Sequence, residues 1–284
     1  MSFDPNAHRD ASLANWEEAA SGWARRADEV RRFGAPVSHW MLDAIEPQPG
    51  QRVLELAAGL GETGMLAAEL VAPVGGVIVS DQAEAMLEGA RARAHELGLT
   101  NIEFKVFNAE WIDLPLASVD AVLCRWGYML MADPGAALAE TRRVLRPGGR
   151  LALAVWDSVQ ANPWALLPAQ ELIERGLSKP PGPEDPPGPF ALGDAERVQE
   201  FLAGAGFTDI QVQALELERR HASFEELWEV TLDLSRSFHD AVLERPEAEI
   251  EKIKLSLAAR FAPHTDAGGA LVIPARTLVA VASA

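Results

Sequence analysis

Cysteine is almost absent from this sequence of 284 residues, where it occurs once, at Cys124. A single cysteine excludes an internal disulfide and any cysteine-rich metal site. It is also typical of a reducing compartment, so we expect a cytoplasmic protein. The first residues, MSFDPNAHRD, contain no apolar stretch of the kind that a secretory signal needs, and we therefore expect no export.

Long apolar runs and an excess of positive charge are also missing. No run approaches the ~20 residues of a membrane-spanning helix, so we expect no membrane insertion. Lysine and arginine number 25 against 42 aspartates and glutamates, which gives a formal net charge of −17. Binding to nucleic-acid backbones requires clustered basic residues, so we predict no nucleic-acid partner. A small-molecule substrate stays possible, because a local pocket can differ from the overall field.

The sequence does contain a regular alternation of strand-like and helix-like segments up to residue 156. Short runs rich in valine, isoleucine and leucine alternate with segments of helical period. The predicted strands are 52–56, 76–80, 102–107, 119–124 and 150–156. Such alternation predicts right-handed crossovers and a parallel sheet covered on both faces. In these sheets ligands bind outside the carboxyl ends of the strands.

The flanking regions predict helices and two further strands around this sheet. We expect a helical arm at 10–45, a proline-rich loop or linker at 178–190, a helix at 193–207 with Asp194 as its N-cap, a strand at 208–220, helices within 224–260 and a closing strand region at 270–284. These elements fit one domain better than two. Its parts would be the arm (1–48), the ligand-binding core (49–156) and a covering region with a helical insertion (157–284).

A glycine-rich loop follows the first predicted strand in the stretch VLELAAGLGETG, residues 53–64. Gly59, Gly61 and Gly64 match the pattern G-x-G-x-x-G, and Asp81 follows at the distance of a ribose-binding acid. A nicotinamide-dependent oxidoreductase is therefore one reading of the loop.

Two acids, Glu55 and Glu62, argue against a dinucleotide at this loop. A pyrophosphate would face like charges there. Two unit charges ~4 Å apart interact by ~4 kcal/mol at an effective dielectric near 20. The loop therefore favours a ligand with cationic character.

The same stretch resembles the first motif of the class I S-adenosylmethionine-dependent methyltransferases. Further resemblances follow in the family's order within residues 50–156: VIVSDQAEAML, FNAEWIDLP and VLRPGGRLALAVW. The likeness is greatest to the ubiquinone/menaquinone C-methyltransferase-like group. The resemblance implies a single doubly wound α/β fold with a mostly parallel, seven-stranded sheet. It also implies S-adenosyl-L-methionine as cofactor and a small-molecule methyl acceptor.

The resemblance also implies which residues contact the cofactor. They are Glu55, Ala57, Gly59, Gly61, Asp81, Gln82, Met86, Asn108, Ala109, Glu110 and Arg125. Asp81 would accept both ribose hydroxyls, and Glu55 would either orient the loop or meet the methionine ammonium. Two positions depart from the family pattern. Ala57 stands where a glycine is usual, and Asn108 stands where an acid is common.

Aromatic residues indicate the acceptor site, because eight tryptophans accompany a single tyrosine. Trp23, Trp126, Tyr128 and Trp164 fall where a cleft should form, and an aromatic cleft favours a planar or apolar acceptor. Tyr128 is the candidate for direct acceptor contact. Three other tryptophans are expected to serve packing only: Trp16, Trp40 and Trp156.

Catalytic and metal-binding clusters are not evident from spacing. The six histidines are scattered at positions 8, 39, 95, 221, 239 and 264. We therefore predict no metal site and identify no general base. Without a base, a non-catalytic S-adenosylmethionine-binding protein remains the alternative to an enzyme.

Overall fold

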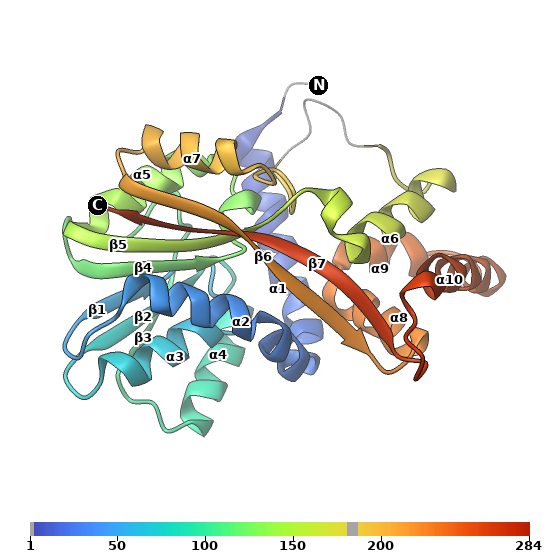
Figure 1. Cartoon of the computed structure of the whole chain (residues 1–284), viewed down its shortest axis with the longest axis horizontal. Helices are drawn as coiled ribbons and strands as arrows, with labels where there is room; N and C mark the ends of the chain where they lie inside the picture. Colours follow the sequence, from blue (N-terminus) through green and yellow to red (C-terminus); the bar gives the residue numbers. More distant parts are fainter. Residues whose placement is uncertain (1–2, 181–186) are drawn as a thin grey trace.

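A seven-stranded sheet runs through the centre of the computed structural model, which describes residues 3–180 and 187–284 (Figure 1). The strands are β1 (Arg52–Glu55), β2 (Gly76–Asp81), β3 (Ile102–Val106), β4 (Val119–Arg125), β5 (Leu145–Trp156), β6 (Thr208–His221) and β7 (Leu271–Ser283). Residues 181–186 of the predicted proline-rich linker lie outside the described part of the chain.

The strand order is β3-β2-β1-β4-β5-β7-β6. Neighbours from β3 to β5 pair in parallel, whereas β7 runs antiparallel to both β5 and β6. The central strands are continuous apolar runs because helices cover both of their faces. This arrangement confirms the predicted doubly wound, mostly parallel sheet of seven strands.

Three helices connect the parallel strands: α3 (Glu62–Val71), α4 (Glu84–Glu96) and α5 (Pro134–Val144). Asp133 caps α5, since its Oδ1 accepts a hydrogen bond from the backbone N–H of Ala136 at 2.9 Å. Further along the chain, Asp194 caps α7 (Ala195–Gly204) as predicted, by accepting from the N–H of Arg197 at 3.0 Å.

The N-terminal arm forms two helices, α1 (Pro5–Arg25) and α2 (Ala27–Ile45). It begins earlier than the predicted residue 10, because Asp4 accepts from two backbone N–H groups and Pro5 fits the first helical turn. α1 packs against α4 and α8, whereas α2 packs against β5, β6 and β7. The arm therefore bridges the two ends of the sheet.

The covering region adds helices at the far end of the β6–β7 pair (Figure 1). They are α6 (Pro163–Glu174), α8 (Phe224–Leu234), α9 (Arg236–Leu243) and α10 (Glu247–Phe261). These helices and the start of β7 enclose a second apolar cluster, apart from the core around the sheet. α6 was not predicted from the sequence. Within the described residues, no helix combines the length and the apolar character needed to cross a membrane.

Candidate functional site

A pocket lies at the carboxyl ends of β1 to β4, and α1 covers it. Parallel strands bring their following loops together at this edge of a sheet. The predicted residues that line the pocket are Ala57, Gly59, Asp81, Gln82, Met86, Asn108, Ala109, Glu110, Arg125, Trp126 and Trp23. Four predicted residues are not among its lining: Glu55, Gly61, Tyr128 and Trp164.

The glycine loop turns sharply through residues with positive φ. Ala57, Gly59 and Gly61 have φ angles of 48°, 54° and 74°. This backbone conformation costs an L-residue about 1–3 kcal/mol, so Ala57 is strained where glycine would not be. The methyl group of Ala57 also leaves no room for a side chain at position 127. A Cβ added to Gly127 would lie 2.7 Å from the Cβ of Ala57.

Glu55 holds the glycine loop from behind instead of facing the pocket. It is 2% exposed, and its Oε2 accepts a hydrogen bond from the N–H of Gly64 at 2.9 Å. A Cβ at position 64 would lie 2.4 Å from that oxygen, so only glycine permits the approach. Burial raises the pKa of Glu55 to about 7 despite the nearby Arg125. Its geometry is that of a residue that orients the loop.

Arg125 places a buried cation at the pocket. Burial lowers its pKa, while Glu55 and Glu62 act in the opposite direction. Its guanidinium lies 4.9 Å from the ring centre of Trp126, and its Nη1 has no hydrogen-bond partner among the described residues. Gly34 of α2 makes room for it, because a Cβ there would come 1.6 Å from Nη1. Arg125 therefore lines the pocket while its Nη1 packs against α2.

Asp81 is fixed at the end of β2 by two backbone groups. Its Oδ2 accepts from the N–H of Gly59 at 2.8 Å, and its Oδ1 accepts from the N–H of Ala83 at 3.0 Å. It is 8% exposed, and burial raises its pKa. A carboxylate has about four acceptor positions, so Asp81 can still accept from a ligand.

The loop after β3 is tied to α1 and to the loop after β2. Asn108 donates weakly to the side chain of Gln82 at 3.4 Å, and Gln82 donates to Ser12 at 3.0 Å. Glu110 accepts from Arg9 at 3.1 Å and from the N–H of Ala132 at 3.0 Å. The carboxylate of Glu110 therefore joins α1 to the sheet edge.

Aromatic rings form one side of the pocket. Trp126 has a φ of 61°, stacks on Trp156 with ring centres 4.5 Å apart, and donates from its Nε1 to Thr277 at 3.0 Å. Trp23 packs edge-on against Trp16, and its Nε1 has no hydrogen-bond partner in the described chain. Trp23 therefore lines the pocket and carries a buried donor that has no partner among the described residues.

The structure places three aromatic residues differently from their predicted positions relative to the pocket. Tyr128 is fully buried, and its hydroxyl bonds to Thr141 at 2.7 Å, because the short helical turn after β4 directs it toward α5. Trp164 packs against Trp156 outside the pocket and donates to Asn162 at 2.9 Å. Trp16, expected to serve packing alone, does line the pocket.

Sequence reasoning also missed most of the α1 face over the pocket. The residues concerned are His8, Arg9, Ser12 and Trp16. Residues 8, 12 and 16 recur at intervals of four, which places them on one face of a helix. The spacing of these residues therefore indicates, from the sequence alone, that they share one face of a helix. The contribution of Phe107, Leu130 and Met131 had no comparable signal.

Comparisons with known proteins match the region that forms the pocket. A family described as "Methyltransferase domain" matches residues 47–178. Nocamycin O-methyltransferase from Saccharothrix syringae is 30% identical over 203 residues, covering 69% of this chain and 72% of that protein. Ubiquinone/menaquinone biosynthesis C-methyltransferase UbiE from Pseudoalteromonas translucida is 38% identical over 103 residues, covering 36% and 41%.

Solved structures extend the likeness in fold. The YcgJ protein from Bacillus subtilis superposes with a TM-score of 0.58 at 19% identity, covering 87% of this chain and 97% of that one. The chain spans about half the length of several curated relatives that it matches. The family match runs from β1 to α6 and so includes the loops that line the pocket.

Proposed function

Because the chain belongs to the class I S-adenosylmethionine-dependent methyltransferase family, we propose that it transfers a methyl group to a small acceptor of aromatic or apolar character. The observation that carries this proposal is one pocket that combines Asp81, the glycine loop and three tryptophans. The printed activities of its relatives, O-methylation and C-methylation of small molecules, agree with such an acceptor. The cytoplasmic location and the absence of nucleic-acid partners stay predictions from composition.

The residues at the pocket suit the chemical groups of the cofactor. Asp81 would accept from the ribose hydroxyls, and Met86 with Asn108 would flank the adenine. Arg125 would lie beside the methionine carboxylate, because it brings a buried cation to the pocket lining. The methyl group to be transferred comes from the sulfonium of the bound cofactor.

Positioning and exclusion of water are the catalytic contributions that this chain offers. In-line displacement gains most from orientation, which can supply ~7–11 kcal/mol of the barrier. Trp23 and Trp126 would hold a planar acceptor and exclude water from the pocket. The Nε1 of Trp23, which has no hydrogen-bond partner among the described residues, would donate to a polar atom of that acceptor.

Two measurements test this proposal in sequence. Calorimetric titration should show binding of S-adenosylhomocysteine and none of NAD, and the reverse result would overturn the cofactor assignment. Incubation with CD₃-labelled S-adenosylmethionine and a panel of phenols, quinones and aromatic acids should then yield a labelled product by mass spectrometry. Cofactor binding without any labelled product would favour the non-catalytic alternative.

A matched pair of variants tests the acceptor side. Trp23→Leu should raise the KM for the acceptor by about tenfold, since an aromatic contact contributes ~0.5–1.5 kcal/mol beyond its buried area. Trp111→Leu is the control, because Trp111 is 57% exposed and is not part of the pocket lining. Equal effects of the two substitutions would contradict the aromatic acceptor site.

A further inference from the structure

A buried histidine without hydrogen-bond partners lies away from the pocket. His221 ends β6 and is 2% exposed, and neither of its ring nitrogens has a partner among the described residues. An unsatisfied buried polar atom costs ~1–3 kcal/mol, so such groups usually bind something.

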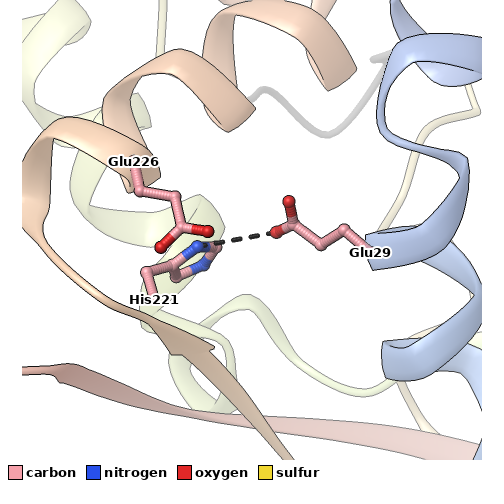
Figure 2. A group of neighbouring side chains, drawn as sticks. All are labelled: Glu29, His221 and Glu226. Atoms are coloured by element: carbon pink, nitrogen blue, oxygen red, sulfur yellow. Dashed lines mark ion pairs between the residues drawn. The ribbon is translucent and has the colours of Figure 1, made fainter.

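Two carboxylates face this imidazole from other elements, as Figure 2 shows. Glu29 comes from α2 and Glu226 from α8, and one candidate ligand atom of each of the three residues lies within 4.8 Å of the others. The Nδ1 of His221 is 3.5 Å from Oε1 of Glu29. Because almost 200 residues separate Glu29 from the other two, no sequence spacing indicates the cluster.

We propose that Glu29, His221 and Glu226 bind a divalent transition-metal ion, with Zn²⁺ as the best fit. One imidazole nitrogen and two carboxylate oxygens are a donor set that Zn²⁺ accepts, with water completing the coordination. Bonds of about 2.0–2.2 Å in a tetrahedral site place ligand atoms roughly 3.4 Å apart. Rotation of the two glutamate side chains, both only partly buried, can close the remaining gap.

The cluster combines one imidazole with two carboxylates, and burial raises the pKa of Glu29. Burial and the nearby Arg219 lower the pKa of His221 to about 4, so its imidazole is neutral at pH 7. Arg219 and Arg26 are the neighbouring cations, and the two carboxylates offset their charge. Glu226 is further oriented by the N–H of Ala222, which donates to its Oε2 at 2.5 Å and leaves the other oxygen available.

The proposed ion would join three parts of the chain that are otherwise held by packing and ion pairs. It would connect the arm helix α2, the end of β6 and the first helix of the β6–β7 insertion. A ligand that binds only the folded state stabilises it by mass action, so Zn²⁺ should raise the unfolding temperature by several degrees.

The test is calorimetric titration of the full chain, freed of metals with EDTA, with ZnCl₂ alone. The wild-type protein should bind one ion per chain, and Glu29→Gln and Glu226→Gln should each weaken binding at least tenfold while keeping the side-chain volume. His239→Asn is the control and should bind as the wild type does, because the partly exposed His239 bonds to the adjacent Asp240 at 3.0 Å and is not part of the cluster. Equal affinity of the wild type and both glutamine variants would overturn the proposal.

Substitution with Co²⁺ provides a second readout that needs no variant to fold. The wild-type protein should show visible ligand-field absorption at one equivalent of Co²⁺, and Zn²⁺ should displace it. A spectrum equal to that of Co²⁺ in buffer would overturn the site. Both measurements omit cofactor and acceptor, so their outcome is independent of methyl transfer.

Discussion

The pocket has two sides that are built in different ways. Its floor consists of the loops after β1, β2, β3 and β4, where Asp81 and Arg125 lie next to residues that follow a strand directly. Its roof is α1, a helix that precedes the sheet and reaches the floor through side chains. The floor is therefore specified by short local motifs, whereas the roof depends on tertiary packing.

The link between roof and floor is polar and is spread along α1. Arg9 pairs with Glu110, and Glu17 accepts from the N–H groups of Glu84 and Ala85 at 2.7 and 3.2 Å. Those two groups begin α4, whose own N-cap position is Ala83, so a residue of the roof caps a helix of the floor. Substitutions on the two sides should consequently have separable effects.

The largest expected effect concerns the floor, through Glu55. Its folded-state pKa of about 7 lies above the ordinary 4.5, so the wild-type protein should lose stability as the pH rises from about 4.5 to 7. Relative to Glu55→Gln, the loss should be on the order of 3 kcal/mol and should level off above pH 7. Urea unfolding at pH 5, 6, 7 and 8 measures it. The titration of His221 occurs in both proteins and cancels in the difference.

The next effect concerns cofactor affinity at the floor. Asp81→Asn should weaken binding of S-adenosylhomocysteine by about 10–100-fold, because hydrogen bonds to an ionised group contribute ~1.5–3 kcal/mol. Calorimetric titration measures the change. Asp113→Asn, on an exposed residue, is the control. An unchanged dissociation constant for Asp81→Asn would show that the floor does not hold the ribose at this residue.

A substitution in the roof should act more weakly. Arg9→Gln removes the pair with Glu110, whose side chain is 1% exposed, and should lower cofactor affinity about fivefold. Arg25→Gln on the same helix removes a pair in which the arginine is 62% exposed, and should change affinity by less than about twofold. Similar results for the two variants would mean that α1 does not contribute to the bound state.

The smallest effect concerns strain in the floor. Ala57→Gly should raise the free energy of unfolding by about 0.5–1 kcal/mol, since relief of a positive φ exceeds the entropic cost of glycine. Ala117→Gly, at a φ of 52°, is the matched control outside the pocket. Both variants should be stabilised in thermal unfolding, but only Ala57→Gly should alter cofactor affinity.

The floor depends on local motifs and the roof on tertiary packing, and this difference explains which features of the fold and the site could be predicted from the sequence. The family and the sheet of seven strands are confirmed, because apolar runs and ordered motifs are local features. Asp194 as a cap was correct for the same reason. Tyr128 and Trp164 lie outside the pocket lining, since the side chain of each packs against a partner elsewhere in the chain, Thr141 and Trp156 respectively.

Residues that converge from distant elements had no signal in the sequence at all. Glu110 was predicted as a cofactor contact and lines the pocket, but the sequence does not indicate that its carboxylate binds Arg9, 101 positions away. His221 is one of six histidines that are scattered along the sequence, and its two carboxylate neighbours become visible only when α2 and α8 are placed beside β6. Such groupings depend on the packing of helices and not on local pattern.

The position of α1 has a consequence for the order in which the molecule is completed during synthesis. Arg25 of α1 donates to Asp233 of α8, 208 positions later. Glu17 of α1 accepts a hydrogen bond from the N–H of Glu84, which can form only after the start of α4 has been synthesised. The apolar face of α1 packs against Leu60, Ala83 and Met86, so it stays exposed during synthesis until the start of α4 has emerged, and the contact with α8 forms later still. Contacts of such long sequence separation form late and slow the folding of a domain. The ion pair between α1 and α8 is thus among the last contacts of this helix to form.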